Sequence, residues 1–144
     1  MSVGVNETLV RRLFDDVLNT GNVELVDDIL APGYLNHFGG MPPADRDTFK
    51  RLLPLYPASF ANFHMDIEDL IAEGDRVTVR FTMHGTHEAE FMGVPPTHRQ
   101  ISMGGMAFFR IADGKIVEEY INEDLLGMMQ QLTTPPTGPA PTAE

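Results

Sequence analysis

The residues with the clearest chemical potential lie on a short stretch near the C-terminus. Asp113-Gly114 separates two apolar runs, a pattern typical of a two-residue hairpin turn, because both residue types tolerate the positive φ that such a turn needs. A regular hairpin about this turn gives the pairs Phe109 with Glu118, Ala107 with Tyr120, Gly105 with Asn122 and Met103 with Asp124. One face of the predicted sheet therefore carries Tyr120, Asn122 and Asp124 opposite small or apolar residues.

Asp124 is the predicted general base of this face. Apolar surroundings disfavour the ionised form of a carboxyl group, so they raise its pKa towards the range useful for proton transfer. An apolar segment starts directly afterwards at Leu125, so an alternative interpretation makes Asp124 the N-cap of a helix, a position in which aspartate is common.

A second pair of polar residues lies in an expected loop from Tyr34 to Pro43. Histidine changes its protonation near neutral pH, and the amide of an asparagine can hold a carbonyl oxygen or an enolate. His37 and Asn36 are therefore candidate polar partners of the base. The alternative for His37 is an ordinary surface histidine.

Three further histidines, His64, His84 and His87, have carboxylates nearby in the sequence. Two histidines three positions apart on a strand do not converge on one ion as a helical i, i+4 pair does, so no metal site is predicted. The chain has no cysteine, no glycine-rich phosphate loop, no dinucleotide fingerprint and no Gly-x-Ser-x-Gly elbow. We therefore expect chemistry without a cofactor.

The composition limits the class of protein. The 144 residues suffice for one domain with a single core, and a formal net charge of -11 without any basic run disfavours nucleic-acid binding. No stretch approaches the roughly 20 apolar residues of a membrane span, and the first residues lack the charged and apolar regions of a signal peptide. The expectation is a cytoplasmic protein with neither a membrane nor a nucleic acid as partner.

Three helical segments must come first in the fold. Apolar residues recur at helical spacing in 6–19, 22–30 and 44–60. Gly21 is placed to end the first segment, Asn22 can cap the second, and Pro54 and Pro57 should make the third irregular.

After residue 62 the hydrophobic period changes to two, which predicts strands. The expected strands cover 63–68, 77–84, 87–91, 100–111 and 115–123. Helices followed by a strand meander indicate an α+β fold with helices on one face of a bent antiparallel sheet, in a single domain of residues 1–132. Residues 133–144 are rich in Pro and Thr, have no large apolar side chain to bury and are expected to be disordered.

Several stretches of the chain resemble one family. They are Gly85-Thr86-His87-Glu88-Ala89-Glu90-Phe91-Met92-Gly93-Val94-Pro95-Pro96-Thr97, then Phe109-Arg110-Ile111-Ala112-Asp113-Gly114-Lys115-Ile116-Val117-Glu118, then Asp124 followed by Gln130-Gln131-Leu132. With Asn36-His37 and the helical start, they are similar to the SnoaL-like polyketide cyclases of the nuclear transport factor 2-like superfamily over residues 6–132. The resemblance implies a cone-shaped α+β barrel with a deep cavity between three helices and a curved sheet. It also implies a homodimer or homotetramer assembled through the sheet.

The resemblance further implies a reaction. In these cyclases an aspartate at the position of Asp124 takes an acidic proton from a polyketide methyl ester without metal or cofactor. The enolate then closes the last ring of an anthracycline-type skeleton by an intramolecular aldol reaction. His37 and Asn36 would polarise the carbonyl or orient water. The expected substrate-binding residues are Tyr34, Phe81, Phe91, Met103, Gly105, Ala107, Phe109, Tyr120 and Asn122.

The sequence departs from the family at two places. The penultimate strand lacks the polar residue, often histidine, that is usual near the base, and Tyr120 stands where tryptophan is common. Some relatives instead hydroxylate an aromatic polyketide with oxygen and a separate reductase, and small Gly105 and Ala107 before Tyr120 would leave room for such a planar ligand. Further alternatives are an isomerase or dehydratase using the same carboxylate, and a non-catalytic binding or dimerisation module whose own side chains fill its cavity.

Overall fold

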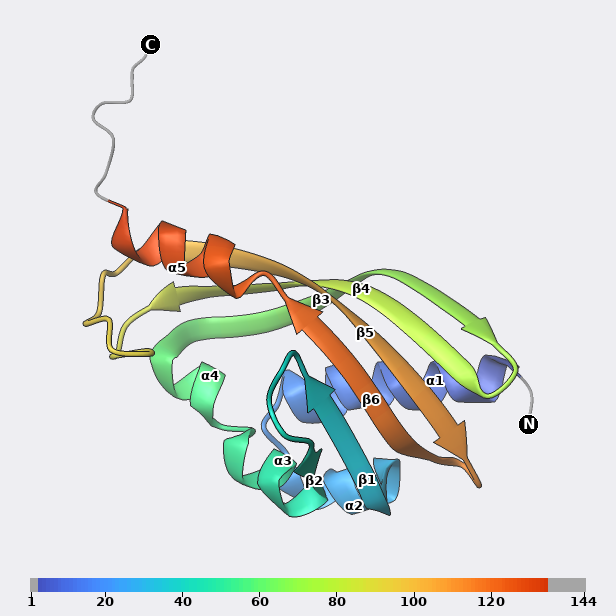
Figure 1. The fold of residues 1–144 in the computed structure, drawn as a ribbon. Coiled ribbons are helices and arrows are strands. Elements are labelled where there is room, and N and C mark those ends of the chain that lie inside the picture. Colours follow the sequence, from blue (N-terminus) through green and yellow to red (C-terminus); the bar gives the residue numbers. More distant parts are fainter. Residues whose placement is uncertain (1–2, 135–144) are drawn as a thin grey trace.

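A curved sheet carries the N-terminal helices on one of its sides (Figure 1). The computed structural model describes residues 3–134. Its strands are β1 (Leu30–Phe38), β2 (Ala44–Asp45), β3 (Phe60–Glu73), β4 (Arg76–His87), β5 (Gln100–Ala112) and β6 (Lys115–Glu123). Their spatial order is β2-β1-β6-β5-β4-β3, with β1 parallel to β6 and the other neighbouring pairs antiparallel. The predicted α+β fold, with helices on a mostly antiparallel sheet, is confirmed.

The helices before β3 follow the predicted ranges. The helical segments are α1 (Val3–Arg12), η1 (Leu13–Leu18), η2 (Val23–Leu25), α2 (Val26–Ile29), α3 (Arg46–Leu52), α4 (Leu55–Ser59) and α5 (Leu125–Thr133). The π-helical turn η1 directly continues α1, and Asn22 caps η2 by accepting a hydrogen bond from the backbone N–H of Glu24 at 3.2 Å. Pro54 separates α3 from α4, as expected of a residue that cannot donate a backbone hydrogen bond inside a helix.

Three elements differ from the sequence prediction. Half of the expected loop 34–43 is strand, because β1 runs to Phe38 between β2 and β6. No strand covers 87–91: β4 ends at His87, and the following loop contains only an isolated bridge between Phe91 and Val94. The helix α5, which had been only an alternative to the catalytic interpretation of Asp124, is present.

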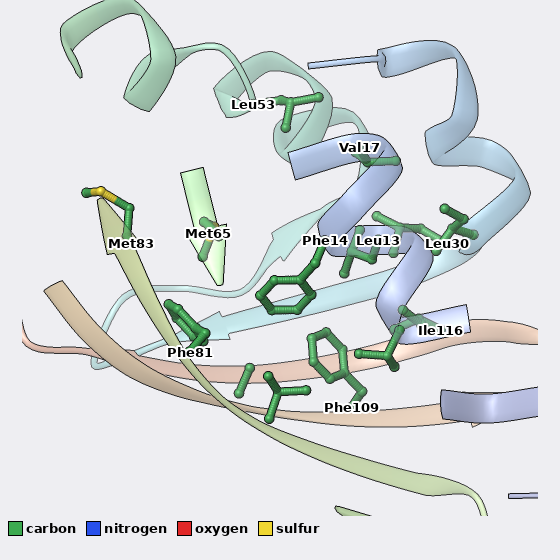
Figure 2. Packing of buried hydrophobic residues seen from close by; sticks show 14 of the residues in the cluster. Leu13, Phe14, Val17, Leu30, Leu53, Met65, Phe81, Met83, Phe109 and Ile116 are labelled. Carbon is green, nitrogen blue, oxygen red and sulfur yellow. The ribbon is translucent and has the colours of Figure 1, made fainter. Parts of the chain in front are cut away.

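The core lies between the helices and the side of the sheet that faces them, which we call the inner face (Figure 2). Phe14 projects from η1 towards Phe81 on β4 and Phe109 on β5, with ring centroids 5.7 and 6.4 Å apart. Alternating buried residues along β4 and β5 supply the sheet side of this core, as the period-two pattern predicted. The opposite side of the sheet is called the outer face below.

The ends of the chain add two observations. The predicted disordered tail was expected to begin at residue 133, yet Thr133 still belongs to α5, and residues 135–144 of that prediction lie outside the described residues. Within residues 3–134, no helix is long and apolar enough to cross a membrane.

Candidate active site

The position of every polar side chain on β6 depends on a bulge just after the hairpin. Asp113 and Gly114 form the predicted turn with φ of 52° and 76°, and Ile111 pairs with Ile116 as expected. The next pair is Arg110 with Glu118, so Val117 has no partner on β5. One extra residue on a strand turns all following side chains to the opposite face.

The predicted pairs beyond the bulge are therefore wrong by one residue. The observed pairs are Phe109 with Glu119, Phe108 with Tyr120, Ala107 with Ile121, Met106 with Asn122 and Gly105 with Glu123. Glu119 is only 5% exposed, whereas Tyr120 is 45% exposed on the outer face. The carboxylates that the strand directs towards the interior are thus Glu119 and Glu123.

Both carboxyl groups line a cavity of about 180 Å³ between the helices and the inner face. Its wall is mainly apolar and is built from η1, β1, β2, α3, α4, β3 and β6. The polar side chains in the wall are those of Asn36, Tyr56, Glu119 and Glu123. A mostly apolar cavity with a few convergent polar groups is the usual form of a small-molecule site.

Glu119 is held by a buried phenol. The hydroxyl of Tyr34, itself fully buried on β1, donates a hydrogen bond to Glu119 Oε1 at 2.5 Å. Burial raises the pKa of the Glu119 carboxyl to about 7; the charge of Glu123 acts in the same direction, and the hydrogen bond from Tyr34 opposes it. Burial, with the charge of Glu119, also raises the pKa of Tyr34 well above its ordinary value, so its hydroxyl remains a donor.

Glu123 has a similar partner on a helix. Tyr56 of α4 donates a hydrogen bond to Glu123 Oε1 at 3.1 Å. Burial raises the pKa of Glu123, and the hydrogen bond from Tyr56 partly opposes this effect. The cavity therefore contains two carboxyl groups that retain protons more readily than exposed glutamates, each oriented by a phenol from a different element.

Asn36 adds a free acceptor beside Glu119. Residues Asn36 and Glu119 are direct neighbours in the pairing of β1 with β6. The Oδ1 atom of Asn36 is buried and has no hydrogen-bond partner among residues 3–134. Since a buried acceptor without a partner is costly, this atom is suited to a polar group of a bound molecule.

Asp124 occupies a different position from the one predicted. It is exposed, does not line the cavity, and accepts a hydrogen bond from the backbone N–H of Gly127 at 2.9 Å as the N-cap of α5. The helix-cap interpretation is therefore confirmed. Its role as a general base remains a prediction that the geometry does not favour.

His37 and two predicted lining residues lie on the outer face, so the expectation that they meet Asp124 in a pocket is wrong. The His37 ring stacks on Tyr120 with centroids 4.2 Å apart, and its Nε2 lies 2.9 Å from Glu118 Oε2. Asn122 is exposed on the same strand as Tyr120. The cause is the bulge for Tyr120 and Asn122, and the alternation of β1 for His37, whose neighbour Asn36 faces inwards.

The other predicted lining residues belong mostly to the core. Phe81, Met103, Ala107 and Phe109 are buried in it and do not line the cavity. A Cβ atom at Gly105 would lie 2.5 Å from Phe81 Cζ, so the Phe81 ring occupies the room that was expected to admit a planar ligand.

Phe91 and Tyr34 do not line the cavity themselves, but each contacts a residue that does. The ring of Phe91 packs on Tyr56 with centroids 5.4 Å apart, and Tyr34 contacts the cavity through Glu119. Sequence reasoning missed Glu119 and Glu123. The alternation Glu119-Ile121-Glu123 was visible, but only the bulge decides which half of the alternation faces inwards.

Known proteins match most of the chain. The family model described as SnoaL-like polyketide cyclase matches residues 8–132. A nogalonic acid methyl ester cyclase of Streptomyces nogalater is 32% identical over 126 residues, covering 81% of this chain and 90% of that protein.

Among the solved structures that share the fold are two candidate polyketide cyclases. IdmH, a candidate polyketide cyclase from Streptomyces antibioticus, has a TM-score of 0.79 and 30% identity, covering 88% of this chain and 97% of that one. A candidate SnoaL-like polyketide cyclase from Jannaschia sp. CCS1 has a TM-score of 0.83 and 25% identity, covering 92% of this chain and 94% of that one.

Proposed function

Since this chain belongs to the SnoaL-like polyketide cyclase family, we propose that it catalyses the intramolecular aldol cyclisation of an aromatic polyketide methyl ester, with Glu119 as general base. Support for the substrate class comes from the relative named as a nogalonic acid methyl ester cyclase. The observation that carries the proposal is a carboxyl group with a pKa of about 7, buried in the wall of a mostly apolar cavity.

The proposed reaction needs one group that both takes and returns a proton. The Glu119 carboxylate accepts the acidic proton from the carbon next to the ester carbonyl. The enolate carbon attacks a second carbonyl carbon of the same molecule, which forms the new C–C bond and leaves an alkoxide. Glu119 then returns the proton to that oxygen. A pKa near the working pH suits both steps, because each protonation state is accessible.

The neighbouring side chains would orient these steps. Tyr34 holds the Glu119 carboxyl in place, and Asn36 would bind the enolate oxygen through its amide N–H or a substrate hydroxyl through its unpartnered Oδ1. The Tyr56–Glu123 pair would bind a polar group at another part of the same substrate. The resemblance assigned the base to Asp124; its position as an exposed helix cap makes Glu119 the better candidate.

The test is incubation of the purified protein with an anthraquinone polyketide methyl ester, with analysis of products by chromatography and mass. An isomer of unchanged mass that carries a new ring supports the proposal, and heat-denatured protein is the control. A parallel reaction contains a tetracyclic anthracyclinone, a quinone reductase, NADPH and air. Product one oxygen heavier in that reaction, with no isomer from the ester, would contradict cyclisation in favour of hydroxylation.

We further propose that two copies associate through the outer face of the sheet, as the family resemblance implies. Leu35, Met106 and Tyr120 are large apolar or aromatic side chains exposed on this face. Their burial between two copies would remove apolar surface from water. Light scattering should give the mass of a dimer or tetramer for the wild type and a lower mass for Met106→Lys; a monomeric wild type would contradict the proposal.

A further inference from the structure

The outer face carries a cluster of imidazole and carboxylate groups, on the side of the sheet opposite the cavity. The pairing of β3 with β4 places His64 directly opposite His84, and both side chains are exposed. Asp66 lies two residues after His64 on the same face. Its carboxylate contacts both rings: His64 Nε2 lies 3.0 Å from Oδ1, and His84 Nε2 lies 3.2 Å from Oδ2.

A second carboxylate completes the cluster. Ligand atoms of Asp66, Glu68 and His84 all lie within 4.8 Å of one another. Glu68 has no ion pair or hydrogen bond with the side chain of another residue in the described range 3–134, and neither it nor Asp66 pairs with Lys or Arg there. The neighbouring cation, Arg80, is already bonded to Asp69 at 2.7 Å. In the described part of the chain the cluster therefore holds two carboxylates with imidazoles beside them and neither Lys nor Arg to neutralise them.

The spacing fits a shared ion. Two ligands of one tetrahedral zinc ion, each bonded at about 2.0–2.2 Å, lie roughly 3.3–3.6 Å apart. The separation of His84 Nε2 from Asp66 Oδ2, 3.2 Å, is close to this value, and a ligand atom of Glu68 lies within 4.8 Å of those of both residues. As a set of surface hydrogen bonds alone, the cluster would add little stability.

We propose that Asp66, Glu68 and His84 bind a divalent transition-metal ion, represented by zinc, on the outer face of β3 and β4. An imidazole among the ligands favours zinc and similar ions over calcium and magnesium, which prefer oxygen ligands alone. Three protein ligands leave a coordination position for water. His64, hydrogen-bonded to the other oxygen of Asp66, orients that ligand.

An ion bound at this site would stabilise the sheet and would take no part in the proton transfer at Glu119. Asp66 and Glu68 belong to the edge strand β3 and His84 to its neighbour β4, so a bound ion would tie the edge strand to the sheet. Met65, between His64 and Asp66, faces the other way and lines the cavity. Ion binding would thereby stabilise the strand that forms one wall of the cavity, since a ligand that binds only the folded state stabilises it.

The test measures zinc binding by the tag-free, chelator-treated full chain in competition with a coloured zinc indicator. The wild type should bind one zinc ion per chain, and His84→Ala and Asp66→Asn should each weaken binding by at least about 10-fold, the loss that follows even from changing a residue that only orients a ligand of the metal. Saturating zinc should also raise the melting temperature of the wild type and not of His84→Ala.

The matched control is His98→Ala. His98 is another exposed histidine, with Nδ1 2.5 Å from Glu88 Oε1, but the pair belongs to no cluster of three candidate ligands in the described part of the chain. This variant should bind zinc as the wild type does. Equal losses in His98→Ala and His84→Ala, or wild-type binding no tighter than that of His84→Ala, would overturn the proposal.

Discussion

The hydroxyl of Tyr34 lies 2.5 Å from Glu119 Oε1, and both side chains are buried. The phenol comes from β1 and the carboxylate from β6, strands that are parallel neighbours in the sheet although the residues are 85 positions apart in sequence. The hydrogen bond stabilises the ionised carboxyl group, while burial disfavours it. This balance gives the cavity a carboxyl group whose pKa is about 7.

Tyr34→Phe should move the acid limb of the pH dependence of kcat/KM to higher pH. The substitution removes the hydrogen bond that lowers the pKa of Glu119, so burial acts without opposition and the carboxyl group loses its proton only at a higher pH. The rate of cyclisation, measured between pH 5 and 9, checks this. Tyr120→Phe is the control, because Tyr120 lies on the outer face, and an equal shift in both variants would contradict the role given to Tyr34.

Glu119→Gln should increase stability at pH 8 and leave it nearly unchanged at pH 4. In the folded protein the pKa of Glu119 is about 7, against 4.5 for the free group. Between these values the unfolded chain releases the proton first, so the free energy of unfolding falls as pH rises, by up to roughly 3 kcal/mol. Glutamine cannot ionise and avoids this loss, while its oxygen still accepts from Tyr34.

Urea denaturation of wild type and Glu119→Gln at the two pH values measures the difference directly. Glu73→Gln, which removes an exposed carboxylate from β3, should follow the pH dependence of the wild type. The same stability difference between Glu119→Gln and wild type at pH 4 and pH 8 would show that Glu119 does not titrate in this range.

Gly105→Ala should destabilise the fold by about 1–3 kcal/mol through overpacking. The new Cβ atom would lie 2.5 Å from Phe81 Cζ and 3.0 Å from the backbone oxygen of Asn122, so the strand or the ring must move. At Gly104, one residue earlier on β5, a Cβ atom meets nothing within 4 Å. Gly104→Ala is therefore the matched control in thermal denaturation, and similar melting temperatures for the two variants would contradict the packing described for Gly105.

Local patterns in the sequence were enough to predict most of the fold. Helical spacing before residue 62 and period-two alternation after it gave the α+β class, and Asp113-Gly114 gave the hairpin. The strand β1 was missed because Pro32-Gly33 interrupts it and because its pairing with β6 joins segments far apart in the chain. Such parallel pairing has no local sequence signal comparable to a hairpin turn.

The candidate site was less accessible to sequence reasoning. The residue types were suitable, and β6 was correctly identified as the strand that carries the site. However, Val117 has no partner on β5, and this bulge reverses the face on which the later side chains of β6 lie. A bulge of this kind depends on packing across the sheet and has no fixed signature when no glycine marks it. Asn36 was selected for its chemistry and does line the cavity, whereas its neighbour His37 faces outwards.

The most direct test of the central claim compares two conservative variants, Glu119→Gln and Asp124→Asn, in the cyclisation of the polyketide methyl ester. Asparagine caps a helix about as well as aspartate, and glutamine keeps the acceptor for Tyr34, so both variants should fold. With Glu119 as the general base, Glu119→Gln should lose about 10² to 10⁴-fold in kcat while Asp124→Asn retains most of its activity. Full activity in Glu119→Gln together with loss of turnover in Asp124→Asn would contradict the account and return the base to Asp124.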